Sequence, residues 1–567
     1  MKDKTHIFLL ILILLAGFFL RVAPIRFGLP SKNLALTTYN PDEPLSYYSL
    51  ERMVPSKLDF SPKRAFLWGG FSVYILGFFL KISQVAGMVS PVTREFLIAN
   101  LHEADKLYVI GRLISIIFGT LSILLIYLIA KKAYNSTTGL ISAGLLCITA
   151  GHIINSFYVR PDVIMLFFAL LGALFSVMII SGRNRTKYYV LAGICVGLAT
   201  ATKLSAGVYV IVPVLAHFIR GDSVKNKNLW ILIASSAAGF LIGCPYSIFD
   251  FPTFWYYMKM NFAFAGGTTH PVEFALFGPG WLSYIRYYLP HAMGWPLLAG
   301  GLAGFVYITA KQLSSIKSRS QSGAPYDMLF LISGIIIYFV ITRPKNQAAW
   351  YTLPVIPFFV LFAARTAGAM LSSKIVKKSV PAVITLLALV FIFAYSSVYS
   401  LANLNLYVSK NTREETSEWI KNNVPESAKV AIPRSYFWTP GILRQYNPPY
   451  NLLMGGDIQS ALSEAVLGLD SIKKEADYVV LSEFEYRDYI YYPDFLANYF
   501  SKQEQEKDKV LRGAEILQSI MFNTDRFEEV ARFNRQASFM GIVFRKNYPP
   551  HDWLIPNPEI IIYKKLK

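Results

Sequence analysis

The chain of 567 residues is poor in the residues that build metal sites and disulfide frameworks. It has only three cysteines, Cys147, Cys195 and Cys244, and all of them lie in apolar runs. Their spacing fits neither a metal site nor a disulfide framework. The glycines in GGFSVYILG and MGGDIQS do not fit a nucleotide-phosphate loop. The sequence therefore argues against a zinc module, a disulfide-stapled secreted domain and a nucleotide-phosphate site of that kind.

Acidic residues are scarce in one part of the chain. Residues 404–567 hold 21 Lys+Arg and 22 Asp+Glu, so residues 1–403 hold 34 basic but only 13 acidic residues. The basic residues are scattered between apolar runs, which is typical of loops beside a membrane and its anionic headgroups. Nucleic-acid binding is a poor interpretation of this pattern.

Apolar residues dominate what remains. They make up 54% of the chain, above the roughly 45–50% that is usual for soluble domains. The mean hydropathy is +0.40. A helix needs roughly 20 apolar residues to cross the hydrocarbon core. We expect eleven membrane spans, the first an uncleaved N-terminal helix, at about residues 6–24, 107–130, 138–155, 158–180, 188–201, 204–219, 229–246, 284–310, 327–342, 350–370 and 380–402.

The loop charges predict the topology. Five basic clusters, at about residues 131–132, 183–187, 220–227, 311–319 and 374–378, fall in alternate loops and therefore lie on one side, which should be the cytoplasm. With the N-terminus inside, the parity holds only if the apolar run 66–88 does not cross but lies against the protein as a juxtamembrane or re-entrant helix. If this run crosses, the N-terminus is outside instead and the loop near residue 42 is cytoplasmic.

Segment 187–220 contains one interior charge, Lys203. A single helix of this length would be much longer than a bilayer is thick, at about 1.5 Å per residue. Two short spans broken near Lys203 fit better, and the break places the ammonium at the outer surface.

The charged C-terminal part predicts a water-soluble α/β domain. TREETSEWIKNNV has the pattern of a helix, and AKVAIP, YVVLSEF, FMGIVFR and EIIIYKK have the pattern of strands. The predicted fold is a polytopic α-helical membrane protein. Its membrane domain covers residues 1–403, with a first outer loop at about 25–106, and its C-terminal soluble α/β domain covers residues 404–567.

Two adjacent acids stand out in TTYNPDEPLSYY, just after the first span. Asp42 and Glu43 lie between two prolines and among tyrosines, which favours a lined cleft over an ordinary acidic turn. Asp162 is the only acid between residues 106 and 221, beside Arg160 in YVRPDVIML. It can cap a helix, which is compatible with a functional role.

Other polar residues at the outer ends of the spans also have two interpretations. Arg112 and Lys203 can be interface anchors or phosphate ligands. His270, in the outer loop 247–283, is a candidate metal ligand, although a lone histidine is more often not one. A divalent metal therefore stays an open alternative, and the sequence establishes no cofactor that is required for certain.

Several tracts, in their order, resemble the GT-C superfamily of glycosyltransferases. They follow the Asp-Glu pair and are GRLISIIFGTLSILLIYLIAKKAY, HIINSFYVRPDVIMLFF, GICVGLATATKLSAGVYVIVP, RPKNQAAWYTLPVIPFFVLFAAR and TREETSEWIKNNVPESAKV. More closely, they resemble the dolichyl-phosphate-mannose–protein mannosyltransferases (glycosyltransferase family 39) and the bacterial lipid A aminoarabinose transferases. The resemblance covers about residues 5–430. One departure concerns the family's H-P-P-L-G-K-like tract, where this chain has RAFLWGGFSVYIL.

The resemblance implies a membrane enzyme that moves a sugar from a polyprenyl-phosphate-linked donor to an acceptor hydroxyl. The family's first-loop acid matches Asp42, its arginine at the second span matches Arg112, and its second outer acid matches Asp162. Asp42 would be the general base, in an inverting attack, with Glu43 and Asp162 as further catalytic residues. Arg112 and Lys203, with Arg160 or Lys345 as further candidates, would bind the donor phosphate.

The same resemblance implies the partners and the location. The partners would be the lipid-linked donor, a glycan, lipid or protein acceptor and membrane lipids, without nucleic acid. The chain would lie in a bacterial-type inner or plasma membrane, with its active site and C-terminal domain on the extracytoplasmic face. Two other classes remain open, a transporter or flippase for lipid-linked sugars and a non-catalytic assembly protein, although we see no clear internal repeat of the transporter type.

Overall fold

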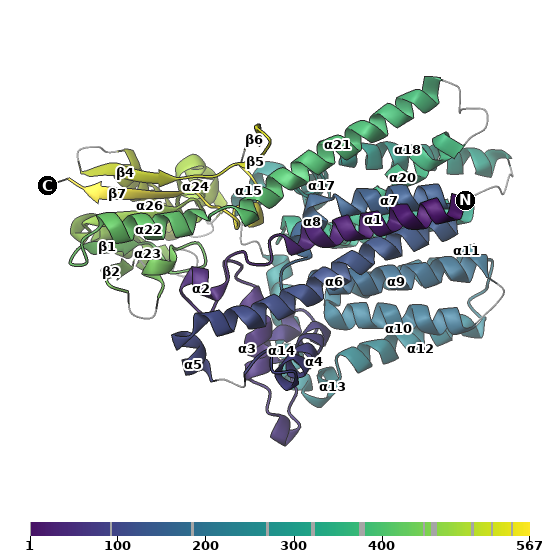
Figure 1. Ribbon diagram of the computed structural model, residues 1–567, viewed down its shortest axis with the longest axis horizontal. Helices are drawn as coiled ribbons and strands as arrows, with labels where there is room; N and C mark the ends of the chain where they lie inside the picture. Colours follow the sequence, from purple (N-terminus) through teal and green to yellow (C-terminus); the bar gives the residue numbers. More distant parts are fainter. Residues whose placement is uncertain are drawn as a thin grey trace.

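The computed structural model describes the chain except for short gaps. The described residues are 2–90, 93–182, 186–267, 271–318, 324–372, 380–445, 448–454, 462–499, 504–522, 526–545 and 548–566. A bundle of helices leads into a C-terminal domain that contains a sheet (Figure 1). The N-terminus lies at the end of the bundle away from this domain (Figure 1).

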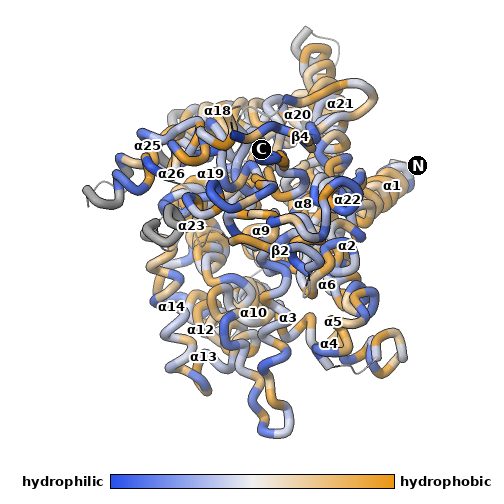
Figure 2. Tube along the Cα trace, turned by 90° about the vertical axis from the view of Figure 1, so that its left-hand side faces the viewer, coloured by the Kyte–Doolittle hydropathy of each residue, from blue (hydrophilic) through white to orange (hydrophobic). Residues whose placement is uncertain are grey.

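Long apolar helices build the bundle. Five segments among the described residues are long and apolar enough to cross a membrane: Lys4–Val22, Leu101–Ala133, Pro161–Ser181, Pro325–Thr342 and Val383–Asn423. In Figure 2, helix α1 is coloured mainly hydrophobic, whereas helix α22 of the C-terminal domain is mainly hydrophilic. The chain is therefore a polytopic α-helical membrane protein. The bundle helices are α1 (Lys2–Val22), α6 (Leu101–Ala133), α7 (Ser136–Cys147), α8 (Ala150–Asn155), α9 (Pro161–Ser181), α10 (Thr186–Thr202), α11 (Ile211–Ile219), α12 (Lys227–Gly243), α17 (Leu289–Met293), α18 (Trp295–Ser318), α19 (Ala324–Thr342), α20 (Ile356–Ser372) and α21 (Val380–Val408).

Close packing of small residues brings the bundle helices together. A Cβ atom on Gly197 of α10 would lie 2.2 Å from the Ser236 carbonyl oxygen of α12. Only glycine permits this approach, so the two backbones lie in direct contact.

The segment between α1 and α6 carries short helices. Helix α3 (Glu43–Glu51) packs on α4 (Phe71–Val85), and the 3-10 segment Lys63–Leu67 packs on α14 (Phe251–Gly266). Figure 1 shows α3 and α4 close together beside the bundle. Helix α4 has 15 residues, fewer than the roughly 20 that a span needs. This length favours the prediction that run 66–88 does not cross.

The structure refines two expected spans. Helix α10 ends at Thr202, and a 3-10 segment (Leu204–Val210) follows, so the predicted break at Lys203 is present. The expected single span 138–155 is instead two helices, α7 and α8, separated at Ile148 and Thr149. The remaining short helices between the bundle helices are α2 (Pro30–Asn33), α5 (Arg94–Ala99), α13 (Tyr246–Phe249), α15 (Pro271–Phe277) and α16 (Gly280–Ser283).

The C-terminal domain is α/β, as the sequence predicts. Its five-stranded sheet has the order β2-β1-β3-β7-β4, with β2, β1 and β3 parallel and β7 antiparallel to both its neighbours. A separate hairpin, β5-β6, packs on α21. The strands are β1 (Lys429–Ile432), β2 (Asn451–Met454), β3 (Tyr478–Ser482), β4 (Phe527–Phe533), β5 (Ala537–Phe539), β6 (Ile542–Phe544) and β7 (Ile560–Lys565), and the helices are α22 (Thr412–Asn423), α23 (Leu462–Glu475), α24 (Glu483–Tyr491), α25 (Pro493–Tyr499) and α26 (Glu504–Phe522).

Candidate active site

Four charged residues form a row of alternating charge. One comes from the first loop, two from the start of α9 and one from the end of α10. Arg160 Nε lies 3.4 Å from Asp42 Oδ2, and Arg160 Nη2 lies 3.3 Å from Asp162 Oδ2. Lys203 Nζ lies 2.6 Å from Asp162 Oδ1. We call Asp42, Arg160, Asp162 and Lys203 the charge row. It brings together residues that are up to 161 positions apart in the sequence.

Local structure explains how each member reaches the row. Asp42 is the N-cap residue of α3, and Arg160 is the N-cap residue of α9. Pro161 supplies the first helical residue of α9, where a missing N–H costs nothing, and Asp162 follows in the first turn. Lys203 stands in the break after α10, with extended backbone. All four therefore lie at helix termini, where polar groups concentrate in this chain.

Exposure separates the two acids of the row. The side chain of Asp42 is 34% exposed, whereas that of Asp162 is 2% exposed. A substrate can therefore reach the carboxylate of Asp42. Asp162 lies between two cations and is suited to holding them in place.

Two aromatic rings line the cationic members of the row. The Arg160 guanidinium lies 4.3 Å from the Trp350 ring, and the Lys203 ammonium lies 4.7 Å from the Tyr351 ring. Rings at these distances attract cations and limit their movement. Trp350 and Tyr351 belong to the 3-10 segment Ala349–Thr352, which connects α19 to α20.

The C-terminal domain reaches this site through Asp552. The backbone N–H of Trp350 donates a hydrogen bond to Asp552 Oδ2 over 2.9 Å. Asp552 is buried, and its burial raises the pKa of the carboxyl group to about 6. The domain therefore holds the aromatic segment that packs on Arg160.

Glu43, the neighbour of Asp42, is fully buried and bound to Arg112. Arg112 donates from Nε to Glu43 Oε1 over 2.9 Å and from Nη2 to Oε2 over 2.7 Å. Its Nη1 donates to the carbonyl oxygens of Ile25 and Phe27. Glu43 also accepts from Val159 N and from Thr38 Oγ1. The pair ties the first loop to α6 and to the segment before α9.

The remaining predicted site residues lie apart from the charge row. Lys345 is exposed, in the loop between α19 and α20, and its backbone N–H donates to the carbonyl oxygen of Ala265. His270 lies outside the described residues. Within the described ranges, no group of three or more His, Cys, Asp or Glu side chains is arranged to hold a metal ion. Arg160 stands between the carboxylates of Asp42 and Asp162, so these residues do not fit a metal site.

Sequence reasoning did not assign a role to three residues of the site. Trp350 and Tyr351 lie in the tract RPKNQAAWYTLPV, where two adjacent aromatic residues between spans were the available signal. Asp552 had no such signal, because acids are common in the C-terminal domain.

The bundle, the short helices beside it and the appended α/β domain define the class, a polytopic α-helical membrane protein. Residues 91–249 match the family model of the dolichyl-phosphate-mannose–protein mannosyltransferases. This match supports the resemblance to GT-C glycosyltransferases that the tracts of the sequence predict.

Individual proteins also resemble this chain. Over 100 residues the chain is 35% identical to dolichyl-phosphooligosaccharide-protein glycotransferase 2 of Pyrococcus furiosus, a match that covers 17% of this chain and 14% of that relative. The fold resembles the Archaeoglobus fulgidus oligosaccharyltransferase in its apo form, with a TM-score of 0.51 at 14% identity over 97% of this chain and 77% of that one. Archaeal AglB from the same organism, in complex with an inhibitory peptide and a dolichol-phosphate, gives a TM-score of 0.50 at 13% identity over 96% and 75% of the two chains.

Proposed function

We propose that this protein transfers a sugar from a polyprenyl-phosphate-linked donor to a hydroxyl of an acceptor, with Asp42 as the general base. The observation that carries the proposal is the charge row, in which the reachable carboxylate of Asp42 ends a line of buried or partly buried ionic groups. The complex of AglB with a dolichol-phosphate supports a lipid phosphate as the leaving group. We further propose that the site and the C-terminal domain lie on the extracytoplasmic face of a bacterial-type membrane.

In the proposed reaction, Asp42 accepts the proton of the acceptor hydroxyl as its oxygen attacks the anomeric carbon. The bond between this carbon and the phosphate oxygen breaks, and the polyprenyl monophosphate leaves with the electron pair. Attack opposite the leaving group inverts the anomeric carbon. Arg160 and Lys203 stabilise the charge that develops on the phosphate, because cations fixed beforehand need little reorganisation during the reaction.

The other predicted residues take supporting roles. Asp162 positions Arg160 and Lys203, since it contacts both. Glu43 and Arg112 satisfy one another in a buried pair, so we assign them to holding the loop that presents Asp42. Lys345 is exposed and precedes Trp350 in the loop between α19 and α20. It is a further candidate for contact with the donor phosphate.

The test compares wild type with Asp42→Asn in membranes, matched for folded protein. Each sample receives a polyprenyl-phosphate donor with a labelled sugar and native envelope acceptors. We expect label transfer with wild type and a loss of about 10²- to 10⁴-fold in the variant, the usual contribution of a general base. The matched control is Glu51→Gln, since Glu51 is exposed at the end of the same helix α3.

Transfer by Asp42→Asn within threefold of wild type would remove Asp42 as the base. A normal rate in the Glu51→Gln control is required for either conclusion, because it shows that α3 tolerates the loss of an acid. Asp162→Asn is then measured in the same way, and we expect it to raise the KM for the donor lipid as well as to slow transfer.

A further inference from the structure

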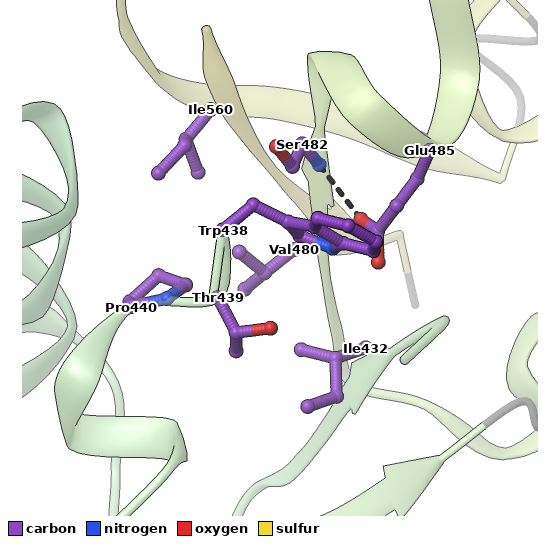
Figure 3. A pocket seen from close by; sticks show the side chains of 8 residues that line it. All are labelled: Ile432, Trp438, Thr439, Pro440, Val480, Ser482, Glu485 and Ile560. Atoms are coloured by element: carbon purple, nitrogen blue, oxygen red, sulfur yellow. Dashed lines mark hydrogen bonds between the residues drawn. The ribbon is translucent and has the colours of Figure 1, made fainter. Parts of the chain in front are cut away.

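The five-stranded sheet of the C-terminal domain buries apolar side chains at its centre. Ile432, Val480 and Ile560 come from three neighbouring strands and line one small pocket (Figure 3). Trp438 lines the same pocket, and all four side chains are buried. The separate hairpin β5-β6 departs from this arrangement, although its sequence FMGIVF is almost wholly apolar.

Three apolar side chains of this hairpin are exposed. Met540 is 87% exposed, and Ile542 and Val543 are 52% exposed each. A Cβ atom on Gly541 would meet no atom of the described residues within 4 Å, so the tip of the hairpin projects away from the protein. The base of the hairpin is held, because Phe544 packs against the large hydrophobic cluster of the bundle.

The residue at the tip is not the one that the turn itself favours. Met540 and Gly541 form the two-residue turn, with φ values of 48° and 82°. Hairpin turns with positive φ at both positions favour Asn or Asp before Gly, because these side chains tolerate the left-handed region. Methionine in this place strains the backbone and also exposes an apolar side chain. An apolar surface outside the chain would offset both costs.

Contacts with α21 place the hairpin at the edge of the membrane. The ring centre of Phe544 lies 5.9 Å from that of Tyr395 and 5.2 Å from that of Tyr399. A helix crosses the hydrocarbon core in roughly 20 residues, so a span that begins at Val380 ends near Tyr399. Tyrosine is typical of the boundary between the hydrocarbon core and the headgroups.

The hairpin also continues the apolar surface of α21. Phe391 is 60% exposed within the span, and its ring centre lies 6.1 Å from that of Tyr395, which contacts Phe544. Asn405 Nδ2 donates to the carbonyl oxygen of Ser538 over 3.0 Å and so fixes β5 beside the helix. Figure 1 shows β5 and β6 at the end of α21 that meets the C-terminal domain. The hairpin therefore stands where α21 leaves the lipid.

We propose that the tip of the β5-β6 hairpin inserts into the lipid leaflet on the side of the C-terminal domain and holds this domain to the membrane. Met540, Ile542 and Val543 enter the region of the acyl chains. Arg545 follows β6 directly and is exposed, so its guanidinium can stay among the headgroup phosphates. A lipid surface fits this place better than a protein partner, because the tip adjoins the part of α21 that the bilayer surrounds. The inference is independent of the proposed sugar transfer.

The first experiment places a fluorescent dye on the tip of the purified full chain in lipid nanodiscs. The native cysteines Cys147, Cys195 and Cys244 are buried, so a thiol-reactive dye labels the introduced thiol of Met540→Cys. Met454→Cys is the matched control, since Met454 of β2 is 62% exposed in the same domain. Lipids with a quencher on the acyl chain should quench the tip dye about fivefold more strongly than the control dye. Iodide in the water should show the opposite order.

Three results would overturn the inference. Equal quenching of the two dyes by the lipid quencher would show that the tip lies in water. Lipid quenching of the tip dye that disappears at one chain per nanodisc would assign the hairpin to a contact with a second copy. Shielding of the tip dye from both the lipid quencher and iodide, at one chain per nanodisc, would place the tip against the protein itself.

The variant Met540→Asn separates lipid contact from folding of the hairpin. Asparagine suits the turn better than methionine, so the variant keeps the hairpin folded. With the dye on Val543→Cys, adding Met540→Asn should reduce quenching by the lipid quencher about twofold or more, because a polar tip withdraws from the acyl chains. Met454→Asn should leave it unchanged. Equal quenching with and without Met540→Asn would contradict a role of Met540 in the lipid.

Discussion

Single residues of the charge row could be predicted because acids are rare in the membrane part of the chain. Asp42, Asp162 and their basic neighbours each stood out from apolar surroundings. The different fates of Asp42 and Glu43 could not be predicted from their adjacency. Successive residues of a helix point about 100° apart, so one carboxylate faces the site while the other faces Arg112.

Asp552 offers a prediction of pH dependence at this scale. Its folded-state pKa of about 6 lies above its ordinary value of 3.8. The folded protein therefore keeps this proton at pH values where the unfolded chain loses it. Its contribution to stability is complete below about pH 4 and is lost as the pH rises through 6, on the order of 3 kcal/mol.

Asp552→Asn should remove this dependence, because the amide oxygen can still accept from Trp350 and does not ionise. The measurement is the thermal unfolding midpoint of the detergent-solubilised protein at pH 4.5 and pH 7. We expect the variant to gain stability relative to wild type as the pH rises. The exposed Asp494→Asn serves as control, and a difference between Asp552→Asn and wild type that stays constant with pH would contradict the argument.

At the scale of elements, length and charge were sufficient to place the break at Lys203, whereas the prediction that run 66–88 does not cross stays a prediction. They missed the break between α7 and α8, because residues 138–155 carry no charge. They also missed α14, whose aromatic-rich sequence has no buried residue among its 16. Its Phe254 and Tyr257 are only partly buried against a small hydrophobic cluster, so the sequence of the helix shows no clear buried face.

The break at Lys203 depends on contact with Gly69. The amide of Leu204 donates to the carbonyl oxygen of Trp68, and a Cβ atom on Gly69 would lie 2.1 Å from the carbonyl oxygen of Ala201. Gly69→Ala must therefore displace the end of α10. We expect a stability loss of about 1–3 kcal/mol and transfer reduced at least tenfold, because Lys203 moves away from Asp162.

Thermal unfolding and the labelled-sugar assay measure these two effects. Gly207→Ala is the control, since the nearest atom to its added Cβ is a methyl carbon of Thr200 at 3.6 Å. If the Gly69 and Gly207 variants behave alike, the contact does not position Lys203.

For the whole molecule, sequence patterns predicted the α/β domain and its strands β1, β3 and β7. The expected strand FMGIVFR instead contains the turn of the β5-β6 hairpin. The patterns also did not predict how the domain docks. The domain is held through Arg413, which is fully buried, stacks on Tyr39 at 4.3 Å and donates to the carbonyl oxygen of Ile555 over 2.8 Å. Backbone carbonyls are present at every residue, so such an interface leaves no trace in composition.

Arg413→Ala should loosen this docking. The variant leaves a cavity and unpaired carbonyl groups between the first loop and the domain, at a cost of several kcal/mol. We expect limited proteolysis in the segment 409–411, between α21 and α22, to become at least tenfold faster than in wild type. Lys421→Ala, an exposed position in α22, provides the comparison, and equal cleavage rates in the two variants would show that Arg413 does not hold the domain.

The hydrogen bond from Trp350 to Asp552 also has a consequence for the order in which the protein is made and folds. Translation produces the membrane helices first, and Asp552 leaves the ribosome 202 residues after its partner. A nascent chain can therefore insert every bundle helix and assemble the charge row while Trp350 still lacks its anchor. A shortened translation product that ends before Asp552 would contain all four residues of the charge row. Its segment Ala349–Thr352 would lack the hydrogen bond from Trp350 to Asp552.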